Sequence, residues 1–455
     1  MTTSNPYHLD ASQIKDPPTG WSGKLRYCGP GFILSASIVG SGELIATTTL
    51  GAEAGFKTLW VIIVSCLAKV ALQLEFARHT IQSGQSSMTA LNGLPGFRYR
   101  GAHWTVWFWL FMQPIKILQL GGIVGGLAMM LNIMLPSVEI WAWCWIVAIV
   151  VAALVCVEKY QFLERVSLLL LMIFTVLTLI SVASLQWTEY AIGWGDLASG
   201  LKGELPKGAL VFVFGTFGLT GVGGDEVMHY TYWLLEKGYA AYVGLYREND
   251  SAWQERARGW IGVMYLDALL SMVAYTVVTV AFYILGAAVL HVRGDVPSGY
   301  AMVETLATMY TESLGPWARV LFLVGAFVVL FSTVFSALAA WTRIDADALD
   351  KVGLLDFEDP TSRRRAIAIL AWFLPLTWAA VFLWYEQPVT MVMIGGLGTA
   401  AILLIVVIAA VHFHWHETVP GLESGLFYRA AFFVSTVSIV ALAGYGFYSA
   451  VTHML

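Results

Sequence analysis

Charged residues are scarce in this chain of 455 residues. Asp, Glu, Lys and Arg make up 12% of it, about half of the roughly 25% that is usual in soluble domains. Apolar residues make up 58%, and the mean hydropathy is +0.71. A soluble globule cannot hide this much apolar surface, so the composition excludes a soluble enzyme, a nucleic-acid-binding protein and a disordered scaffold. The net charge of −5 gives no reason to expect a polyelectrolyte partner.

Cysteine is rare as well. The four cysteines, Cys28, Cys66, Cys144 and Cys156, lie in or beside apolar segments and form no CxxC pair. We therefore expect small buried side chains and neither a disulfide framework nor a zinc site. Residues 1–28 are polar and lack the basic-then-apolar pattern of a signal peptide. We expect them to form a cytoplasmic tail.

Long apolar stretches make up most of the remaining chain. A helix needs about 20 apolar residues to cross the hydrocarbon core of a membrane. Eleven stretches qualify: 29–50, 57–79, 104–135, 138–157, 166–186, 208–235, 258–291, 316–342, 366–385, 388–412 and 427–450. We predict an all-α integral membrane protein whose main partner is the lipid bilayer. The connection at 343–365, with acidic and basic residues mixed, is expected to be solvated surface.

Lysine and arginine are divided unevenly between the two ends of these segments. With residues 1–28 inside, 18 of the 25 Lys and Arg residues fall on the cytoplasmic side and five fall outside, while Lys69 and Lys116 lie within segments. Basic loops stay in the cytoplasm, so this bias indicates orientation. We predict a multi-pass protein of the plasma (inner) membrane, with the N-terminus cytoplasmic and the C-terminus outside.

Two segments contain small residues followed by acid in mid-span. Residues 39–43 read Val-Gly-Ser-Gly-Glu, and residues 222–226 read Val-Gly-Gly-Asp-Glu. Gly weakens a helix, and a charge at mid-membrane costs at least about 2.5 kcal/mol. Two such sites five segments apart predict a 5+5 inverted repeat with two discontinuous helices that meet at a substrate site. The candidate substrate-binding residues are Gly40, Ser41, Gly42, Glu43, Val222, Gly223, Gly224, Asp225 and Glu226.

Other polar residues within the segments must pair, face water or change protonation. The candidates for coupling or charge balance are Lys116, Gln119, His229, Tyr230 and Asp267. Lys116 is placed to neutralise either Glu43 or Asp225. Asp267 either joins two helices or belongs to an ion path, and the sequence favours neither interpretation.

Two groups near the inner ends have simpler interpretations. Glu75 and Arg78 are three residues apart, which predicts a local ion pair on one helix. His412, His414 and His416 suggest a metal site, but only the first and last share a helix face. We therefore favour interfacial histidines over metal ligands.

The chain resembles the Nramp family of divalent metal transporters. The residues that carry the resemblance are Gly29-Pro30-Gly31-Phe32, the break at 40–43, residues 51–57, Leu59-Trp60-Val61, Ser65, Leu72-Gln73, Arg78, Gly221, Tyr230 and Leu314-Gly315-Pro316. The match covers nearly the whole chain. It implies a LeuT-like fold, a ten-helix inverted repeat with discontinuous helices 1 and 6, plus one extra helix. We therefore expect a single transporter domain at 29–455, with repeats at 29–186 and 208–412 and the extra helix at 427–450.

The metal-binding motifs of that family are altered here. Family members carry Asp-Pro-Gly-Asn in the first segment, where this chain has Gly-Ser-Gly-Glu at 40–43. The Met-Pro-His motif of the sixth segment reads Asp-Glu-Val at 225–227, so a carboxylate replaces the thioether ligand. The resemblance thus implies Glu43, Asp225 and Glu226 as metal ligands. Family acids associated with proton movement align with Lys116 and Gln119.

Three functions remain open. The first is secondary transport of a divalent cation, with Mg²⁺ or Mn²⁺ favoured over soft metals because carboxylates suit hard ions. The opened backbone at Gly40 and Val222 would add carbonyl ligands. The second is transport of an amine or amino acid on the same fold, since the Lys116 ammonium repels a divalent cation. The third is a sensor or partner subunit that transports nothing.

The chain contains no nucleophile–base constellation and no GxxxxGK[ST] loop, so we predict neither an enzyme nor a nucleotide-driven pump. No permanently bound cofactor, nucleic acid or obligate protein partner is expected; the cation is a substrate.

Overall fold

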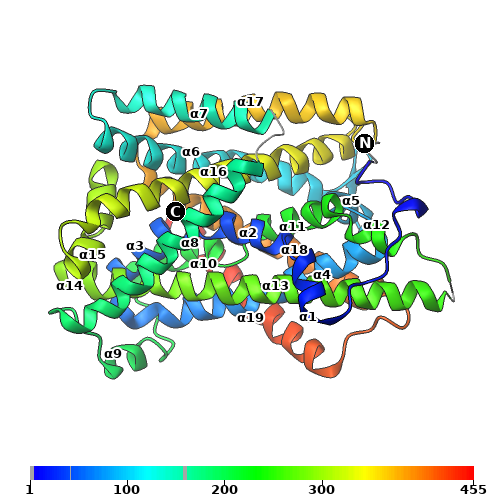
Figure 1. Ribbon diagram of the computed structural model, residues 1–455, viewed down its shortest axis with the longest axis horizontal. Coiled ribbons are helices and arrows are strands. Elements are labelled where there is room, and N and C mark those ends of the chain that lie inside the picture. The colour runs from blue at the N-terminus through cyan, green and yellow to red at the C-terminus, as the bar shows by residue number, and fades with distance from the viewer. Residues whose placement is uncertain (1–4, 41, 157–160, 249, 455) are drawn as a thin grey trace.

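The computed structural model describes residues 5–40, 42–156, 161–248 and 250–454, and helices dominate it (Figure 1). All eleven predicted segments are helical. In chain order they are α2 (Pro30–Ile38) with η2 (Gly42–Thr47) and α3 (Thr48–Ala54), α4 (Leu59–Ser83), α6 (Trp104–Met134), α7 (Ile140–Cys156), α8 (Gln161–Ser184), α10 (Leu210–Leu219) with α11 (Gly224–Lys237), α13 (Ser251–Leu285), α16 (Ala318–Lys351), α17 (Pro360–Tyr385), α18 (Pro388–His416) and α19 (Leu426–Met454).

Short elements connect these helices. They are η1 (Ala11–Gln13), α1 (Gly20–Tyr27), η3 (Gly55–Thr58), α5 (Ser87–Gly93), the antiparallel pair β1 (Arg98–Tyr99) and β2 (Ala102–His103), η4 (Leu185–Trp187), α9 (Trp194–Ser199), η5 (Lys207–Ala209), α12 (Tyr239–Val243), η6 (Gly286–Leu290), α14 (His291–Arg293), η7 (Gly299–Ala301) and α15 (Met302–Leu314).

The helices are long and apolar enough for a membrane. Among the described residues, eight continuous helical stretches meet that condition, and the stretch Gly42–Ser83 joins the end of the first segment to the second. Two further apolar helices, Ile140–Cys156 and Met172–Trp187, are shorter. In Figure 1 the long helices run along the longest axis, with α9, α14 and α15 at one end and α5, α12 and the N-terminus at the other. The chain is therefore a multi-pass helical membrane protein.

Both predicted helix breaks are present. In the first segment α2 ends at Ile38, and the chain resumes at Gly42 as a π-helical turn, η2, that leads into α3. In the sixth segment α10 ends at Leu219 and α11 begins at Gly224. Gly221, within this second break, has a φ of +65°, and a Cβ there would lie 3.0 Å from Cα of Cys66 on α4. Only glycine suits both the left-handed backbone and the close approach of α4.

One carboxylate, that of Asp267 on α13, binds the beginning of α2. Its oxygens accept hydrogen bonds from the backbone N–H groups of Gly29, at 2.8 Å, and Gly31, at 2.6 Å. The hydroxyl of Tyr230 on α11 donates to the same carboxylate at 2.9 Å. A negative group at a helix N-terminus satisfies free N–H groups and complements the helix dipole. Asp267 thus joins three helices, as one of its two sequence interpretations predicts.

The prediction of a solvated surface at 343–365 is wrong for Asp345 and Asp347. Helix α16 continues to Lys351, so both carboxylates lie on a packed helix and are buried. Asp345 accepts from the indole N–H of Trp109 at 3.0 Å, and Asp347 accepts from the Tyr232 hydroxyl at 2.7 Å. These hydrogen bonds replace the water that the sequence pattern led us to expect.

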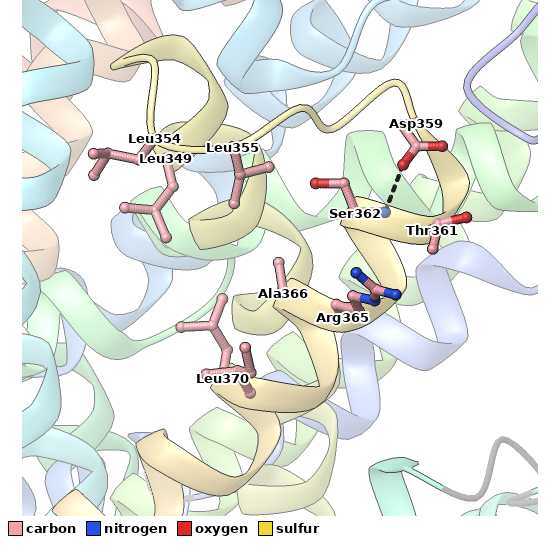
Figure 2. A pocket seen from close by; sticks show the side chains of 10 residues that line it. Leu349, Leu354, Leu355, Asp359, Thr361, Ser362, Arg365, Ala366 and Leu370 are labelled. Carbon is pink, nitrogen blue, oxygen red and sulfur yellow. Dashed lines mark hydrogen bonds between the residues drawn. The ribbon is translucent and has the colours of Figure 1, made fainter.

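Beyond the end of α16 the connection forms a shallow hollow of about 390 Å³ against α17 (Figure 2). Its wall combines leucines with Asp359 and Arg365, and the Asp359 carboxylate caps α17 by accepting from the backbone N–H of Ser362 at 2.8 Å. This part of the connection fits the mixed, solvated surface that was predicted.

The four cysteines are free, as predicted. Cys66 and Cys144 are buried and Cys28 is half-buried. The expectation of a buried side chain is wrong for Cys156, which is exposed at the end of α7. A thiol is apolar enough to lie on the outer surface of a membrane helix.

Asp267→Asn should destabilise the protein by about 2 kcal/mol, because a neutral amide replaces a carboxylate that accepts three hydrogen bonds. The melting temperature of the purified protein in detergent measures this loss. Asp295→Asn is the matched control, since Asp295 belongs to an exposed ion pair with Arg293. An unchanged melting temperature in Asp267→Asn would show that the carboxylate does not anchor α2.

Candidate functional site

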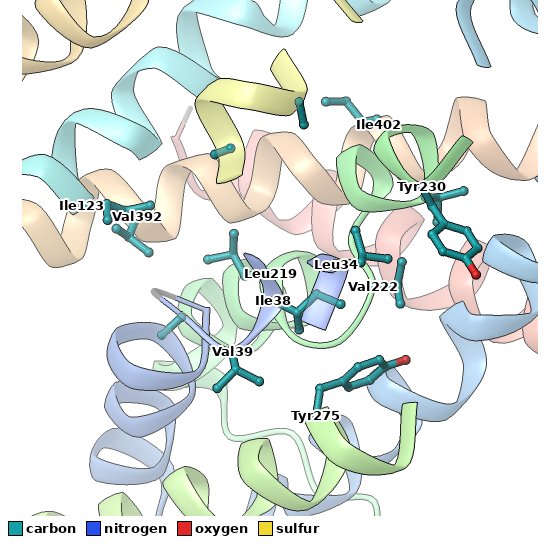
Figure 3. Packing of buried hydrophobic residues seen from close by; sticks show 14 of the residues in the cluster. Leu34, Ile38, Val39, Ile123, Leu219, Val222, Tyr230, Tyr275, Val392 and Ile402 are labelled. Atoms are coloured by element: carbon teal, nitrogen blue, oxygen red, sulfur yellow. The ribbon is translucent and has the colours of Figure 1, made fainter. Parts of the chain in front are cut away.

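The two helix breaks lie side by side in the middle of the molecule. α2 packs against α11, and η2 packs against α10. The Thr216 hydroxyl of α10 donates to the carbonyl of Ala46 in η2 at 3.2 Å. Apolar side chains from both breaks, including Ile38, Leu219 and Val222, gather between them (Figure 3). The inverted-repeat prediction, that the two broken helices meet, is confirmed in this respect.

A small cavity of about 30 Å³ opens where the breaks meet α6 and α16. The residues that line it are Ile38, Gly42, Lys116, Gln119, Leu120, Ile123, Leu219, Asp225, Glu226, His229, Thr333, Ala337 and Trp341. A water molecule needs roughly 10–15 Å³ by a comparable measure, so the cavity has room for one or two waters or for an ion. Six of the residues singled out in the sequence meet here.

A buried ion pair dominates one wall of the cavity. The Lys116 ammonium on α6 contacts the Oδ2 atom of Asp225, and the two side chains are 1% and 3% exposed. Lys116 also donates to Oε1 of Gln119 and to the hydroxyl of Thr399 on α18. Of the two partners that the sequence allowed for Lys116, the structure selects Asp225. The pair satisfies both charges in a region where an isolated charge would be costly.

Two buried polar atoms beside this pair have no hydrogen-bond partner among the residues that the structure describes. They are Oδ1 of Asp225 and Nε2 of His229. Both residues line the cavity, as does Glu226, whose side chain is partly exposed. Asp225 and Glu226 occupy the first turn of α11, where the positive end of the helix dipole favours a carboxylate. The cavity thus presents a carboxylate oxygen and an imidazole nitrogen without partners.

Glu43 lies apart from the cavity. Its Oε2 accepts from the backbone N–H of Gly40 at 3.3 Å, and its Oε1 accepts from the Thr279 hydroxyl of α13 at 3.1 Å. The side chain is fully buried and is not among those that line the cavity. Glu43 therefore contacts α13 and is not part of the cavity wall that holds Asp225.

The remaining candidates fall in several places. At the first break, Gly42 lines the cavity and the N–H of Gly40 donates to Glu43. Val222 and Gly223 lie in the second break, and Gly224 begins α11. A Cβ at Gly223 would overlap Oε2 of Glu226, so this glycine lets the Glu226 carboxylate fold back over the break. Tyr230 and Asp267 bind each other near the start of α2. Ser41 lies outside the described residues.

Sequence reasoning missed the role of Lys69. This residue lies on α4 and is fully buried, and its ammonium group contacts backbone carbonyls of the second break. A single lysine in an apolar helix signals a buried partner, but the helical pattern does not reveal which segment supplies it. Thr399 and Trp341, which also contact Lys116, were missed because each looks like ordinary helix packing.

Two of the histidines at the end of α18 bind carboxylates in the structure. Nδ1 of His414 lies 3.0 Å from Glu75, which also forms the predicted ion pair with Arg78, at 2.5 Å. Nε2 of His412 lies 3.1 Å from Glu417. Across the described residues, no three His, Cys, Asp or Glu side chains are arranged to hold a metal ion. This holds for the cavity too, so any metal there must keep water ligands or draw its ligands together on binding.

Hydrogen bonding by His79 lowers the pKa of Glu417, which lies beyond the end of α18. The histidine and carboxylate therefore form an interfacial charge network between α4 and α18.

Comparison with known proteins assigns the chain to a family. Residues 31–449 match the family model described as "Nramp: Natural resistance-associated macrophage protein-like". A Pasteurella multocida relative, uncharacterized protein PM0681, is 24% identical over 72% of each chain.

Solved structures share the fold. A point mutant of the manganese transporter of Eremococcus coleocola superposes with a TM-score of 0.68 at 16% identity, over 96% of this chain and 90% of that one. MhsT, solved in complex with L-phenylalanine, has a TM-score of 0.53 at 14% identity, over 96% of this chain and all of that one. These likenesses confirm the LeuT-like fold with discontinuous helices 1 and 6.

Lys116→Met should destabilise the protein by roughly 3–5 kcal/mol, because it leaves the Asp225 carboxylate buried without its counter-ion. The double variant Lys116→Met with Asp225→Leu should recover most of that loss. Unfolding in detergent measures both variants. Arg319→Met, which breaks the exposed pair with Glu304, is the control and should cost less than about 1 kcal/mol. Equal destabilisation by the single and double variants would contradict a mutual charge pair.

Proposed function

Because the chain belongs to the Nramp family, we propose that it is a secondary transporter that carries a divalent metal cation across a membrane by alternating access. The family relatives and the solved manganese transporter support transport over catalysis. The cation is a substrate that binds and leaves, so no resident cofactor is needed. We further propose that the repeats at 29–186 and 208–412 form the moving core and that 427–450 is peripheral.

One observation carries this proposal. At the junction of two broken helices, Asp225 and His229 line one small cavity together with Glu226, and no described residue binds Oδ1 of Asp225 or Nε2 of His229. Oxygen and imidazole nitrogen are ligands that divalent metals accept. Discontinuous helices in transporters bind their substrates at such junctions. We propose Asp225 and Glu226 as the first metal ligands, with Glu43 joining them if η2 shifts.

The ligand set favours hard ions. None of the described residues that line the cavity carries a thioether, and carboxylates suit Mg²⁺, Ca²⁺ and Mn²⁺ better than they suit soft metals. Mg²⁺ gives up its water reluctantly and is usually held by one or two carboxylates with several waters retained. Two adjacent carboxylates in a cavity without a complete ligand cluster fit this mode of binding. We propose that Mg²⁺ or Mn²⁺ is the substrate.

Lys116 must yield when the cation binds. In the structure its ammonium group binds Oδ2 of Asp225. It also donates hydrogen bonds to Gln119 and Thr399. A divalent cation at Asp225 repels the ammonium group, which can keep those two hydrogen bonds. Exchange of one cation for the other leaves the carboxylate paired throughout. Lys116 would then return to Asp225 after release and neutralise the empty site.

A second candidate substrate follows from the same pair. Asp225 accepts an ammonium group in the structure, so an organic amine or amino acid could take the place of Lys116. The cavity volume of about 30 Å³ argues against this, since pockets for organic ligands are usually about 300–1,000 Å³. Thermal stabilisation of the purified protein by Mn²⁺ and Mg²⁺, compared with a panel of amines and amino acids, separates the two substrates.

Purified protein in liposomes should take up Mn²⁺ and Mg²⁺ down a gradient, while protein-free liposomes should not. Glu226→Gln should lower the initial rate at least about tenfold, equivalent to about 1.4 kcal/mol, because it removes a carboxylate from the cavity. Glu304→Gln is the matched control, since Glu304 is exposed and pairs with Arg319. Uptake by Glu226→Gln at the wild-type rate would exclude Glu226 from the metal path.

Asp225→Met should shift selectivity toward soft metals. The ratio of Cd²⁺ to Mn²⁺ uptake should rise by about tenfold, because a thioether replaces a carboxylate at the cavity. Measuring both ions in the same liposomes cancels differences in protein amount. Wild-type protein that already prefers Cd²⁺ strongly over Mn²⁺ would contradict the proposed hard-ion substrate.

A further inference from the structure

The Lys69 ammonium group lies at the centre of a cage of backbone carbonyls. Its Nζ donates to the carbonyl oxygens of Phe217, of Gly218 at 3.3 Å and of Thr220 at 2.7 Å. It also lies 4.8 Å from the centre of the Phe217 ring. The side chain is fully buried, and no described carboxylate forms an ion pair with it. A buried lysine that binds only carbonyls and a ring face is bound as a free cation would be.

The carbonyls that form this cage lie where α10 ends: those of Phe217 and Gly218 are in its last turn, and that of Thr220 begins the second helix break. The N–H of Thr220 closes the last turn of α10 by donating to Thr216 at 2.8 Å. The helix ends there, so the carbonyls that follow have no N–H donor four residues ahead. They also form the negative end of the α10 dipole. Half-helix ends of this kind coordinate monovalent cations in transporters that have discontinuous helices.

Helix α4 supports the cage from one side. The Ser65 hydroxyl, one turn before Lys69, lies 3.1 Å from the carbonyl of Phe217 and 3.0 Å from that of Thr220. Thr220 in turn donates its hydroxyl to Ser65 at 2.8 Å. Carbonyl and hydroxyl oxygens are thus gathered around one point.

We propose that Lys69 is a built-in cation, whose ammonium group permanently fills a carbonyl site that would otherwise bind a free monovalent cation. The site is separate from the cavity at Asp225, because Lys69 is not among the residues that line that cavity. The second break therefore keeps its shape without a bound ion. Divalent transport by this chain then needs no Na⁺ or K⁺ at this position.

The test is to remove the ammonium group and supply a cation in its place. Lys69→Ala is purified in full-length form in methylammonium chloride, and its melting temperature is measured after exchange into Na⁺, K⁺, methylammonium or N-methyl-D-glucamine, each at the same ionic strength. N-methyl-D-glucamine is too large for the cage and serves as the baseline. Lys57→Ala, at an exposed position at the end of η3, is the matched control.

Wild type and Lys57→Ala should melt at the same temperature in all four salts. Lys69→Ala should melt at least about 3 °C higher in one or more of the small cations than in N-methyl-D-glucamine, as expected for a ligand that binds only the folded state. A Lys69→Ala protein that is equally stable in every salt would overturn the proposal. Failure to recover folded Lys69→Ala in any of the four salts would overturn it as well. The proposal predicts that a small free cation can replace the missing ammonium group and allow the variant to fold.

The supporting result and the overturning results are all measured as protein stability in monovalent salts. They are independent of whether Asp225 and Glu226 carry Mg²⁺ or Mn²⁺. If the inference holds, liposome uptake of Mn²⁺ by Lys69→Ala should also become dependent on the small cation, whereas wild-type uptake should not.

Discussion

A helix that breaks inside a membrane leaves backbone groups without partners, and no water is available to satisfy them. The arrangement of this protein follows from that constraint at two places. At the second break, α4 supplies Lys69 and Ser65 to the free carbonyls at the end of α10. At the first break, the Glu43 carboxylate accepts from the N–H of Gly40 and is held from α13 by Thr279. The helices that surround the breaks are therefore positioned by polar contacts as well as by apolar packing.

Charge balance is solved differently on the two sides of the second break. The Lys116 ammonium group binds a carboxylate and two neutral oxygen atoms, so it would keep two hydrogen bonds if a cation took its place at the carboxylate. The Lys69 ammonium group binds three backbone carbonyls, two of which also lie within hydrogen-bond distance of the Ser65 hydroxyl. The free-energy cost of moving the ammonium group away from its partners therefore differs between the two lysines. In the proposed function the first exchanges with a substrate cation, whereas in the further inference the second holds the backbone in its broken form.

The sequence predicts the fold in most respects because the relevant signals are local. Glycines followed by acids at 40–43 and 223–226 identify both breaks, and long apolar runs identify the helices. Contacts between distant segments are harder to predict. Lys116 had two possible partners at the level of sequence, and only the packing of α6 and α11 against α18 selects Asp225. Asp347 looked solvated because its partner Tyr232 lies 115 residues away in sequence.

The Asp267 carboxylate has a mechanical consequence. It accepts hydrogen bonds from the first residues of α2 and from Tyr230 of α11, so one rigid group on α13 joins one half of each broken helix. The other halves, α3 and α10, have no such link to Asp267 among the described contacts. A tilt of α2 would therefore pull on the same carboxylate that binds Tyr230, so Asp267 links the position of α2 mechanically to that of α11.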